Sequence, residues 1–174
     1  MKILDFEFEP FINRNKISLQ VKKIASSINN DYENMDPLFI VILNGSFIFA
    51  ADLIREITVH SQVSFIKLSS YKDDSSTGQI HELIGLNGTV FNRNLIIIED
   101  IIDSGLTLQH VWESLEGLGA SSIEIAALFI KLESFKKDIK IKYAGFSIPN
   151  NFIVGYGLDY KGYGRNLQDV YIHS

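Results

Sequence analysis

Three acidic side chains, Glu99, Asp100 and Asp103, lie within five consecutive positions of the sequence. They follow an aliphatic run, Leu95–Ile98, whose unbroken apolar character predicts a strand buried on both faces. Acids that follow such a strand lie at its carboxyl end, where open α/β sheets bind their ligands. Carboxylate oxygens bind magnesium and accept hydrogen bonds from hydroxyl groups. The cluster therefore predicts a site for a metal ion or a sugar.

The competing interpretation is a helix-capping cluster, in which Asp103 or Ser104 begins the helix that follows. Capping explains part of the pattern whatever the function. It does not explain the adjacent acids Glu99 and Asp100 at the end of an aliphatic strand. Carboxylates near a core are costly unless a cation or hydroxyl groups meet them, so we favour the functional interpretation.

A turn of small polar residues, Ser104-Gly105, follows the acids and leads through Leu106 to Thr107. At the start of a helix, such a turn leaves backbone N–H groups and hydroxyls free to bind an anion, and phosphate suits this arrangement. Carboxylates for a metal or a sugar thus lie beside an amide cradle for a phosphate.

The turn Leu43-Asn44-Gly45-Ser46 is a second candidate for anion binding. Its small residues allow backbone amides to approach a ligand closely, although an ordinary strand-to-helix turn has the same composition. The turn is not a P-loop, because no Gly-Lys-Ser/Thr follows a spaced glycine, and it lacks the further glycines of a dinucleotide fingerprint.

The segment Ser69–Gly78 is polar, with Tyr71 as its one large side chain. Such a composition cannot bury itself, which predicts either an exposed hairpin tip or a lid that excludes water from a reactive intermediate. In the lid interpretation, Tyr71 covers the site.

Alternating strands and helices must position these segments, and their alternation predicts an α/β fold with a mainly parallel sheet and right-handed crossovers. Strands are predicted at residues 38–43, 63–68, 95–98, 123–130, 143–146 and 152–156, with a returning hairpin strand at 83–90. Helices are predicted at residues 16–30, 47–57 and 106–118. Residues 1–15 are expected to be irregular, and residues 157–174 receive no assignment.

Composition limits the classes of function. A chain of 174 residues is long enough for one domain with a core. A net charge of −5 argues against broad electrostatic affinity for nucleic acid or a membrane surface. The sequence has no cysteine, which excludes disulfides, thiolate zinc sites and cysteine nucleophiles. No apolar run approaches the roughly 20 residues of a membrane span, and the N-terminus lacks a signal-like apolar region, so we expect a cytoplasmic protein.

The stretch Leu95–Thr107 resembles the phosphoribosyl-pyrophosphate (PRPP) signature of type I phosphoribosyltransferases: aliphatic residues, two acids, Asp, Ser/Thr-Gly and then Thr. The tail Gly145–Tyr160, followed by Arg165-Asn166-Leu167, resembles the C-terminal region of the hypoxanthine(-guanine) phosphoribosyltransferases. The signature indicates PRPP as a substrate, and the tail indicates a purine.

Two further segments resemble the same family. Leu43–Ser46 is similar to its pyrophosphate loop, and Ser70-Tyr71 followed by Ser76-Thr77-Gly78 is similar to its mobile loop. The match runs in the correct order from about residue 38 to residue 167, which is most of the chain.

The resemblance implies the type I phosphoribosyltransferase fold, a twisted and mainly parallel sheet flanked by helices with a small hood. It implies one domain over residues 1–174, with the core at about 35–140 and the hood formed by the N-terminal piece and residues from about 140 to 174. It also implies a homodimer or homotetramer.

The implied reaction is a step of purine salvage. A 6-oxopurine, hypoxanthine or guanine, and PRPP give IMP or GMP and pyrophosphate, with Mg²⁺ as the cofactor. Two rivals stay open: a non-catalytic PRPP-sensing regulator that binds RNA, and a transferase that prefers xanthine or adenine. The net charge of −5 and the presence of Asp103, Tyr71 and Arg165 argue against the regulator.

The resemblance also assigns roles residue by residue. Asp103 matches the residue beside purine N7 that acts as general base. The PRPP and phosphate contacts are Glu99, Asp100, Ser104, Gly105, Leu106 and Thr107. The pyrophosphate contacts are Leu43, Asn44, Gly45 and Arg165, with a non-proline cis peptide between Leu43 and Asn44. The purine contacts are Lys140, Phe152, Ile153 and Asp159, the lid residues are Ser70 and Tyr71, and the metal ligands are Glu99, Asp100 and Asp159.

The sequence departs from the family pattern at three places. Asn44 stands where many relatives carry lysine, and Leu106 replaces a common lysine of the phosphate loop, so backbone amides must contribute more of the binding. Near the predicted purine lysine, Lys142 lies two residues after Lys140, and it stays open as the alternative donor to the purine oxo group.

Overall fold

The structure, a computed structural model, describes residues 1–70, 80–86 and 89–173. Its helices are α1 (Arg14–Asp31), α2 (Phe47–Arg55) and α3 (Leu106–Gly117). Its strands are β1 (Lys2–Ile3), β2 (Phe6–Ile12), β3 (Leu38–Leu43), β4 (Gln62–Ser70), β5 (Ile80–Ile84), β6 (Asn94–Ile102), β7 (Ser122–Ile130), β8 (Tyr143–Ser147), β9 (Ile153–Val154) and β10 (Val170–His173).

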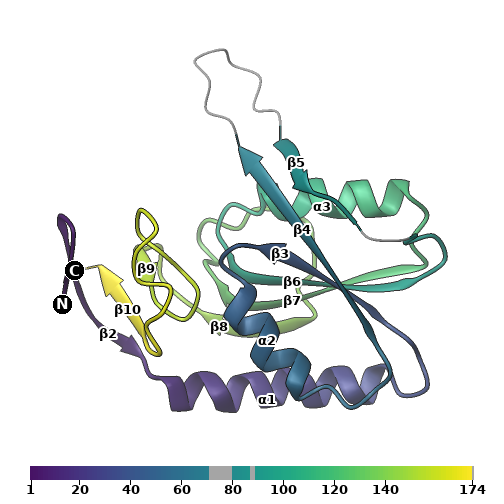
Figure 1. Cartoon of the computed structure of the whole chain (residues 1–174), viewed down its shortest axis with the longest axis horizontal. Coiled ribbons are helices and arrows are strands. Elements are labelled where there is room, and N and C mark those ends of the chain that lie inside the picture. Colours follow the sequence, from purple (N-terminus) through teal and green to yellow (C-terminus); the bar gives the residue numbers. More distant parts are fainter. Residues whose placement is uncertain (71–79, 87–88, 174) are drawn as a thin grey trace.

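A six-stranded sheet in the order β5-β4-β3-β6-β7-β8 forms the centre of the molecule (Figure 1). The five strands β4, β3, β6, β7 and β8 are parallel to one another. At the edge of the sheet, β5 runs antiparallel to β4. β6 pairs with β3 on one side and with β7 on the other, which explains the unbroken apolar run Leu95–Ile98. The predicted mainly parallel sheet is confirmed.

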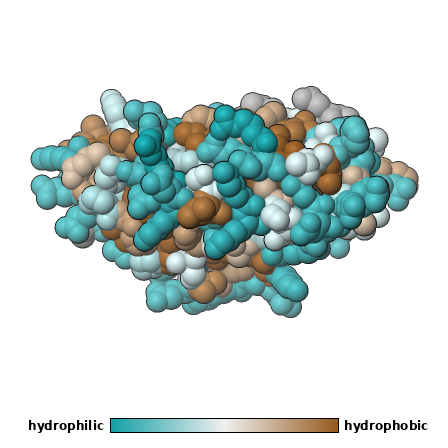
Figure 2. Space-filling view, turned by 90° about the horizontal axis from the view of Figure 1, so that it is seen from below, coloured by the Kyte–Doolittle hydropathy of each residue, from teal (hydrophilic) through white to brown (hydrophobic). Residues whose placement is uncertain are grey.

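Helices cover both faces of this sheet, with α1 and α2 on one face and α3 on the other (Figure 1). Alternate residues of β6 serve the two faces: Ile96 and Ile98 join the core under α1 and α2, whereas Leu95 and Ile97 join the core under α3. Figure 2, which views the molecule from the α1 side, shows hydrophilic residues over most of that surface, with apolar groups between them.

The two ends of the chain together form a small antiparallel sheet in the order β1-β2-β10-β9. The prediction that residues 1–15 are irregular is wrong, because β2 pairs with β10 from Ile12↔Val170 to Phe8↔His173. Phe6 and Phe8 do alternate with acids, which is a strand pattern, but the partner strand is too far along the chain for a local pattern to reveal it. This sheet occupies the place of the expected hood.

Several boundaries differ from the predicted ones. β6 continues beyond Ile98 to Ile102, because Glu99 and Ile101 still pair with β7. The returning hairpin strand lies at Ile80–Ile84, earlier than the predicted 83–90. β8 is the edge strand of the large sheet, so the C-terminal part of the small sheet begins after Ser147. Tyr71 and most of the predicted lid lie outside the described residues.

Among the helices of the described residues, none has both the length and the apolar character that a membrane crossing requires.

Candidate active site

The predicted site residues gather where β3, β6 and β7 end. Parallel strands bring their carboxyl ends to one edge of the sheet, so the turns that follow these strands become neighbours. The segment from Phe152 to Arg165, which includes β9 of the small sheet, closes the site from the side.

Three adjoining cavities occupy this edge, and we name each by one of its residues. The Lys131 cavity, of about 260 Å³, is lined by Gly45, Asp100, Ile101, Asp103, Lys131, Phe152, Ile153, Leu158, Asp159 and Arg165. The Asn44 cavity, of about 240 Å³, is lined by Ile42, Leu43, Asn44, Gly45, Leu68, Glu99, Asp100 and Thr107. The Ser104 cavity, of about 110 Å³, is lined by Glu99, Ile101, Ile102, Asp103, Ser104, Gly105, Leu106, Thr107 and Leu108.

The Asn44 cavity connects the other two. It shares Gly45 and Asp100 with the Lys131 cavity, and Glu99 and Thr107 with the Ser104 cavity. Glu99 and Asp100 both line the Asn44 cavity, and each also lines one of the other two: Glu99 the Ser104 cavity and Asp100 the Lys131 cavity. One ligand with several anionic groups can therefore occupy all three spaces.

Of the two acids near the end of β6, Asp100 is buried, whereas Glu99 is partly buried with its Oε2 oxygen inside the protein. Burial raises the pKa of Glu99 well above its usual range, and the neighbouring Asp100 carboxylate adds to this rise. Within the described structure, Glu99 Oε2 is a buried oxygen without a hydrogen-bond partner. Such an oxygen fits a ligand hydroxyl or a cation, because either one would satisfy it.

Asp100 is 7% exposed, and burial raises its pKa to about 6. Hydrogen bonds from the backbone and the guanidinium of Arg165 oppose this rise, whereas Asp159 adds to it. The Asp100 carboxylate therefore lies near the Arg165 guanidinium and also faces the Asn44 and Lys131 cavities, where a bound metal cation would meet it.

The turn after β3 packs against this carboxylate. The peptide bond between Leu43 and Asn44 is cis, as the family resemblance implies. A Cβ atom at Gly45 would lie 1.8 Å from Asp100 Oδ2, so only glycine fits here. A Cβ at Gly157 would lie 2.2 Å from the Gly45 carbonyl oxygen. The turn is thus enclosed between β6 and the segment before Arg165.

The turn after β6 forms the start of α3. Gly105 is the residue before the helix and has a φ of +78°, a left-handed conformation that favours glycine. Leu106 opens the helix with its side chain 60% exposed. The described residues that line the Ser104 cavity include no lysine or arginine. Backbone N–H groups and the hydroxyls of Ser104 and Thr107 are therefore the groups of this lining that are suited to bind an anion.

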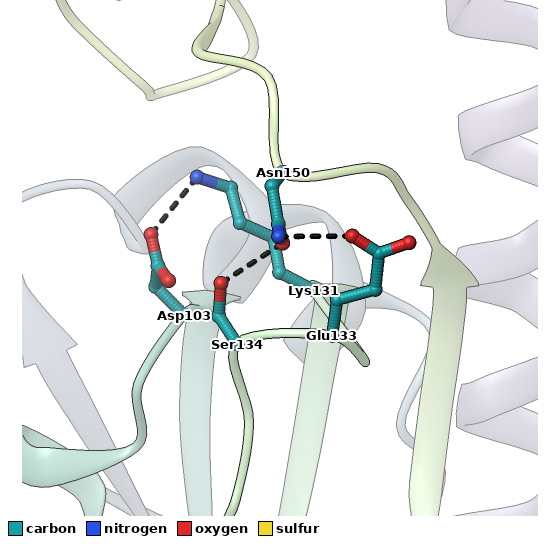
Figure 3. A network of polar contacts seen from close by, with 5 residues as sticks. All are labelled: Asp103, Lys131, Glu133, Ser134 and Asn150. Carbon is teal, nitrogen blue, oxygen red and sulfur yellow. Dashed lines mark hydrogen bonds and ion pairs between the residues drawn. The ribbon is translucent and has the colours of Figure 1, made fainter.

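The turn after β7 contributes Lys131, which together with Arg165 brings positive charge to the Lys131 cavity. Lys131 follows the strand directly, and its side chain is 9% exposed. Its Nζ lies 2.9 Å from Asp103 Oδ2 (Figure 3). A buried ammonium and a carboxylate thus meet beside the ring of Phe152, which is 41% exposed and lines the same cavity. This combination suits a planar, polar ring system.

Neither Lys140, the predicted purine contact, nor the alternative Lys142 is among the residues that line this cavity. Lys142 forms ion pairs with Asp31 and Glu124, at Nζ–oxygen distances of 3.0 and 3.7 Å, and Glu124 lies near the start of β7. The chain crosses from the carboxyl end of β7 to the amino end of β8 over residues 131–142. Phe135 and Lys137 still lie beside Gly105 of the turn after β6, whereas Lys142 lies at the far end of the crossing. The sequence did contain a signal for Lys131, since it directly follows an apolar strand, as Glu99 does.

Arg165 and Asp159, which were both predicted as site residues, line the Lys131 cavity together. Arg165 Nη2 lies 2.6 Å from Asp159 Oδ1, and Arg165 Nη1 donates to the Gly157 carbonyl at 2.7 Å. Asp159 also accepts from the Gly162 N–H at 2.6 Å. The guanidinium is held at the wall of the Lys131 cavity with its charge partly balanced.

An aromatic cluster around Phe152 was missed by the sequence analysis. Phe6 and Tyr160 stack with ring centroids 4.5 Å apart, and both rings are edge-on to Phe152, at 6.4 and 5.7 Å. Phe8 and His173 complete the cluster from β2 and β10. The small sheet therefore supports the exposed ring at the cavity.

Comparison with known proteins gives consistent matches. The model of the phosphoribosyl transferase domain matches residues 12–161. The hypoxanthine-guanine phosphoribosyltransferase of Bacillus subtilis is 40% identical over 157 residues, which are 90% of this chain and 87% of the relative. That of Staphylococcus epidermidis is 41% identical over 147 residues, 84% of this chain and 82% of the relative.

Solved structures agree with these relatives. A hypoxanthine-guanine phosphoribosyltransferase from Bacillus anthracis superimposes with a TM-score of 0.89 at 36% identity, over 97% of this chain and 99% of that one. A hypoxanthine phosphoribosyltransferase from Staphylococcus aureus gives a TM-score of 0.90 at 34% identity, over 98% of this chain and 92% of that one.

Proposed function

We propose that this chain, which belongs to the phosphoribosyl transferase family, transfers a phosphoribosyl group from PRPP to hypoxanthine or guanine and releases pyrophosphate. Its relatives with this activity match most of its length in sequence and in fold. The observation that best supports the proposal is the Lys131 cavity, where Lys131, Asp103 and the Phe152 ring surround one space next to the two acids of β6.

The purine occupies the Lys131 cavity in this proposal. Its ring stacks on Phe152, and its 6-oxo group accepts a hydrogen bond from the Lys131 ammonium. Adenine carries an amino group at that position, and an amino hydrogen facing the ammonium leaves both donors unpaired. The arrangement therefore selects oxopurines.

PRPP occupies the other two cavities. Its 5′-phosphate lies on the backbone amides and hydroxyls of Ser104–Thr107, and its ribose hydroxyls meet Glu99 and Asp100. Its pyrophosphate lies against the turn Leu43–Gly45, with Arg165 as the cation. The missing lysines at Asn44 and Leu106 leave backbone groups as the main anion ligands there.

The reaction forms a bond between purine N9 and the anomeric carbon of the ribose, and breaks the bond from that carbon to the pyrophosphate oxygen. The proton on N7 passes to Asp103, which must lie within hydrogen-bond reach of it. Arg165 balances the negative charge that develops on the leaving pyrophosphate. Orientation and charge, more than covalent chemistry, lower the barrier.

The acids of the site fit magnesium. Glu99 Oε2 is buried without a partner in the described structure, and Asp100 and Asp159 line one cavity. The described residues contain no group of three or more His, Cys, Asp or Glu arranged to hold a metal alone. Magnesium accommodates this, because it commonly takes its remaining ligands from substrate phosphates and water. When bound, it supplies positive charge next to the pyrophosphate.

Three further features of the proposal come from the sequence and its family resemblance. Ser70 and Tyr71 act as the lid that excludes water from the reacting carbon. The enzyme is a homodimer or homotetramer, and it works in the cytoplasm. Light scattering of the purified protein measures the oligomeric state, and replacement of Tyr71 by alanine tests the lid through the rate of PRPP hydrolysis without purine.

The proposed function is tested by incubation with magnesium, PRPP and each of hypoxanthine, guanine, xanthine and adenine. We expect IMP and GMP with release of pyrophosphate, and no AMP. A protein that forms nucleotide from none of the oxopurines would contradict the proposal and favour the RNA-binding regulator. Faster reaction with xanthine than with hypoxanthine would favour the second rival.

Asp103→Asn tests the proton transfer. We expect kcat to fall roughly 100-fold, because general base catalysis contributes about that factor or more, while the KM for PRPP changes little. Asp138→Asn, an exposed carboxylate in the connection between β7 and β8, is the matched control and should leave kcat unchanged. An unaltered kcat in Asp103→Asn removes this residue from the base role.

A further inference from the structure

The two groups that contact the purine belong to different parts of the chain. Lys131 follows β7, whereas Phe152 lies just before β9 of the small sheet. One purine can meet the ammonium with its edge and the aromatic ring with its face only if the distance between these groups is held constant. A connection between the two segments is therefore required.

Asn150 provides this connection through both ends of its side-chain amide (Figure 3). Its Nδ2 donates to Glu133 Oε2 at 3.0 Å, and its Oδ1 accepts from Ser134 Oγ at 2.9 Å. Asn150 lies two residues before Phe152. The amide thus joins the turn that leads to Phe152 with the turn that follows β7.

The residues on the other side of this connection belong to the turn that begins with Lys131. The N–H groups of Ser134 and Phe135 donate to the Lys131 carbonyl oxygen at 3.1 and 2.9 Å, and the Lys131 N–H donates to the Ile102 carbonyl at 2.9 Å. A displacement of Glu133 and Ser134 therefore moves the backbone of Lys131 itself.

We propose that Asn150 is a positioning residue of the purine subsite, which together with Glu133 and Ser134 holds the Lys131 ammonium at a constant distance from the Phe152 ring. The inference rests on the proposed function and adds a specific source of purine affinity to it. Backbone pairing joins the end of β7 to β8 as far as Ile148, whose N–H donates to the Ile130 carbonyl at 2.9 Å. Beyond Ile148, the Asn150 amide supplies the side-chain hydrogen bonds that the described structure shows between the Lys131 turn and the segment that leads to Phe152.

The expected effect is selective for the purine. Asn150, Glu133 and Ser134 form exposed hydrogen bonds, for which water competes, so their loss changes stability little. The PRPP contacts lie on the turns after β3 and β6, which Asn150 does not touch. We expect Asn150→Ala to raise the KM for hypoxanthine roughly three- to tenfold and to leave the KM for PRPP unchanged.

The chain offers a closely matched control in Asn29. Its Nδ2 donates to the Glu56 carbonyl at 3.0 Å and its Oδ1 accepts from the Thr58 N–H at 2.9 Å, so it also joins two segments through both ends of its amide. It lies on α1, and it lines none of the three cavities. Asn29→Ala should lower the melting temperature at least as much as Asn150→Ala does, without a change in either KM.

An exchange of polarity provides the rescue test. Asn150→Asp alone places a second carboxylate against Glu133, and we expect a purine KM at least as high as that of Asn150→Ala. In the double variant with Glu133→Gln, the new amide donates to the new carboxylate, so donor and acceptor exchange places. The double variant should return the purine KM to within about twofold of the wild-type value.

The experiment is steady-state kinetics of the full chain with hypoxanthine and PRPP varied in turn. A wild-type protein without activity would contradict the proposed function and this inference with it. An active wild type with an unchanged purine KM in Asn150→Ala contradicts the positioning role alone. So does an equal rise in Asn29→Ala, or a double variant that stays as impaired as Asn150→Asp.

Discussion

The PRPP half and the purine half of the site are built in different ways. The PRPP half consists of turns that directly follow β3 and β6, which are neighbours in the sheet and have a fixed register. The purine half combines the turn after β7, the segment around Phe152 and the small sheet formed by both chain ends. Strand pairing brings the turns of the first half together, and close packing of Gly45 against Asp100 and Gly157 encloses them. Side-chain contacts between distant segments have a larger part in the second half.

The two halves also differ in burial. Asp100 is buried and Glu99 is partly buried, and both have raised pKa values because burial disfavours their charged forms. Phe152 is 41% exposed, and the hydrogen bonds of Asn150 lie at the surface. The PRPP half is therefore rigid, and its buried carboxylates lower the stability of the fold. The purine half depends on many weak contacts, so it tolerates substitutions better. Substitutions in the two halves should therefore differ in how strongly they change the kinetic constants and in which substrate they affect.

The largest effect is expected from Gly45→Ala in the PRPP half. A methyl group there lies 1.8 Å from Asp100 Oδ2, and Asp100 is too enclosed to move without displacing the turn. We expect kcat/KM for PRPP to fall on the order of 1000-fold, because small displacements of catalytic groups already cost about 100-fold and a charged ligand is displaced as well.

Gly117→Ala is the control for this substitution. A Cβ at Gly117, the last residue of α3, meets no atom within 4 Å, and alanine favours the helix over glycine. Activity should be unchanged and stability equal or higher. Full activity of Gly45→Ala would show that the PRPP half is less rigid than the packing indicates.

A smaller effect is expected from Lys131→Met in the purine half. Loss of one charge-assisted hydrogen bond corresponds to roughly 10- to 100-fold in kcat/KM for hypoxanthine, with a minor change for PRPP. Steady-state kinetics with each substrate varied separates the two. Lys140→Met is the matched control, and the structure predicts no change in either parameter. The opposite pattern, an impaired Lys140→Met and a normal Lys131→Met, would restore the assignment that the sequence favoured.

The smallest effect is on the free energy of unfolding, and it comes from Asp100→Asn. We expect this substitution to stabilise the protein although it removes a residue of the site. The folded pKa of Asp100, about 6, lies above its unfolded value, so the folded state binds more protons between about pH 4 and 6 and loses stability as pH rises through this window. Asp100→Asn removes this loss. We expect the variant to be more stable than wild type by about 2 kcal/mol near pH 8, with little difference near pH 4.

Urea denaturation at the two pH values, with a chelator present to exclude bound metal, measures this difference. The same variant should have lost most of its transferase activity. A variant that is less stable than wild type near pH 8 would mean that the charge of Asp100 stabilises the fold. The buried carboxylate would then not lower the free energy of unfolding.

Much of the PRPP half could be predicted from the sequence. Leu95–Ile98 predicted a buried central strand, and the acids and the Ser104-Gly105 turn predicted a ligand site at its end. Both inferences are local, because a strand paired on both sides must be apolar throughout and the turn after it must lie at the sheet edge. The end of β6 was misplaced, since acids at Glu99 and Asp100 look like a strand terminus until the pairing with β7 is known.

The purine half could be predicted only in part. Phe152, Asp159 and Arg165 were assigned through the family resemblance, and they do line one cavity. Lys131 was missed because the family resemblance directed the assignment to Lys140, although Lys131 directly follows an apolar run. The aromatic support from Phe6 and Tyr160 was missed because these residues are far apart in the chain.

From the sequence alone, we could predict the parallel sheet and the location of two small polar turns and the acids beside one of them. These features follow from periodicity and turn chemistry within a few residues. The tertiary structure was needed to show that Lys131 lines the cavity with Asp103 and Phe152, how deeply Asp100 is buried, and which rings surround Phe152. These features depend on strand order and on the direction in which the chain crosses the sheet, which contacts between distant residues determine.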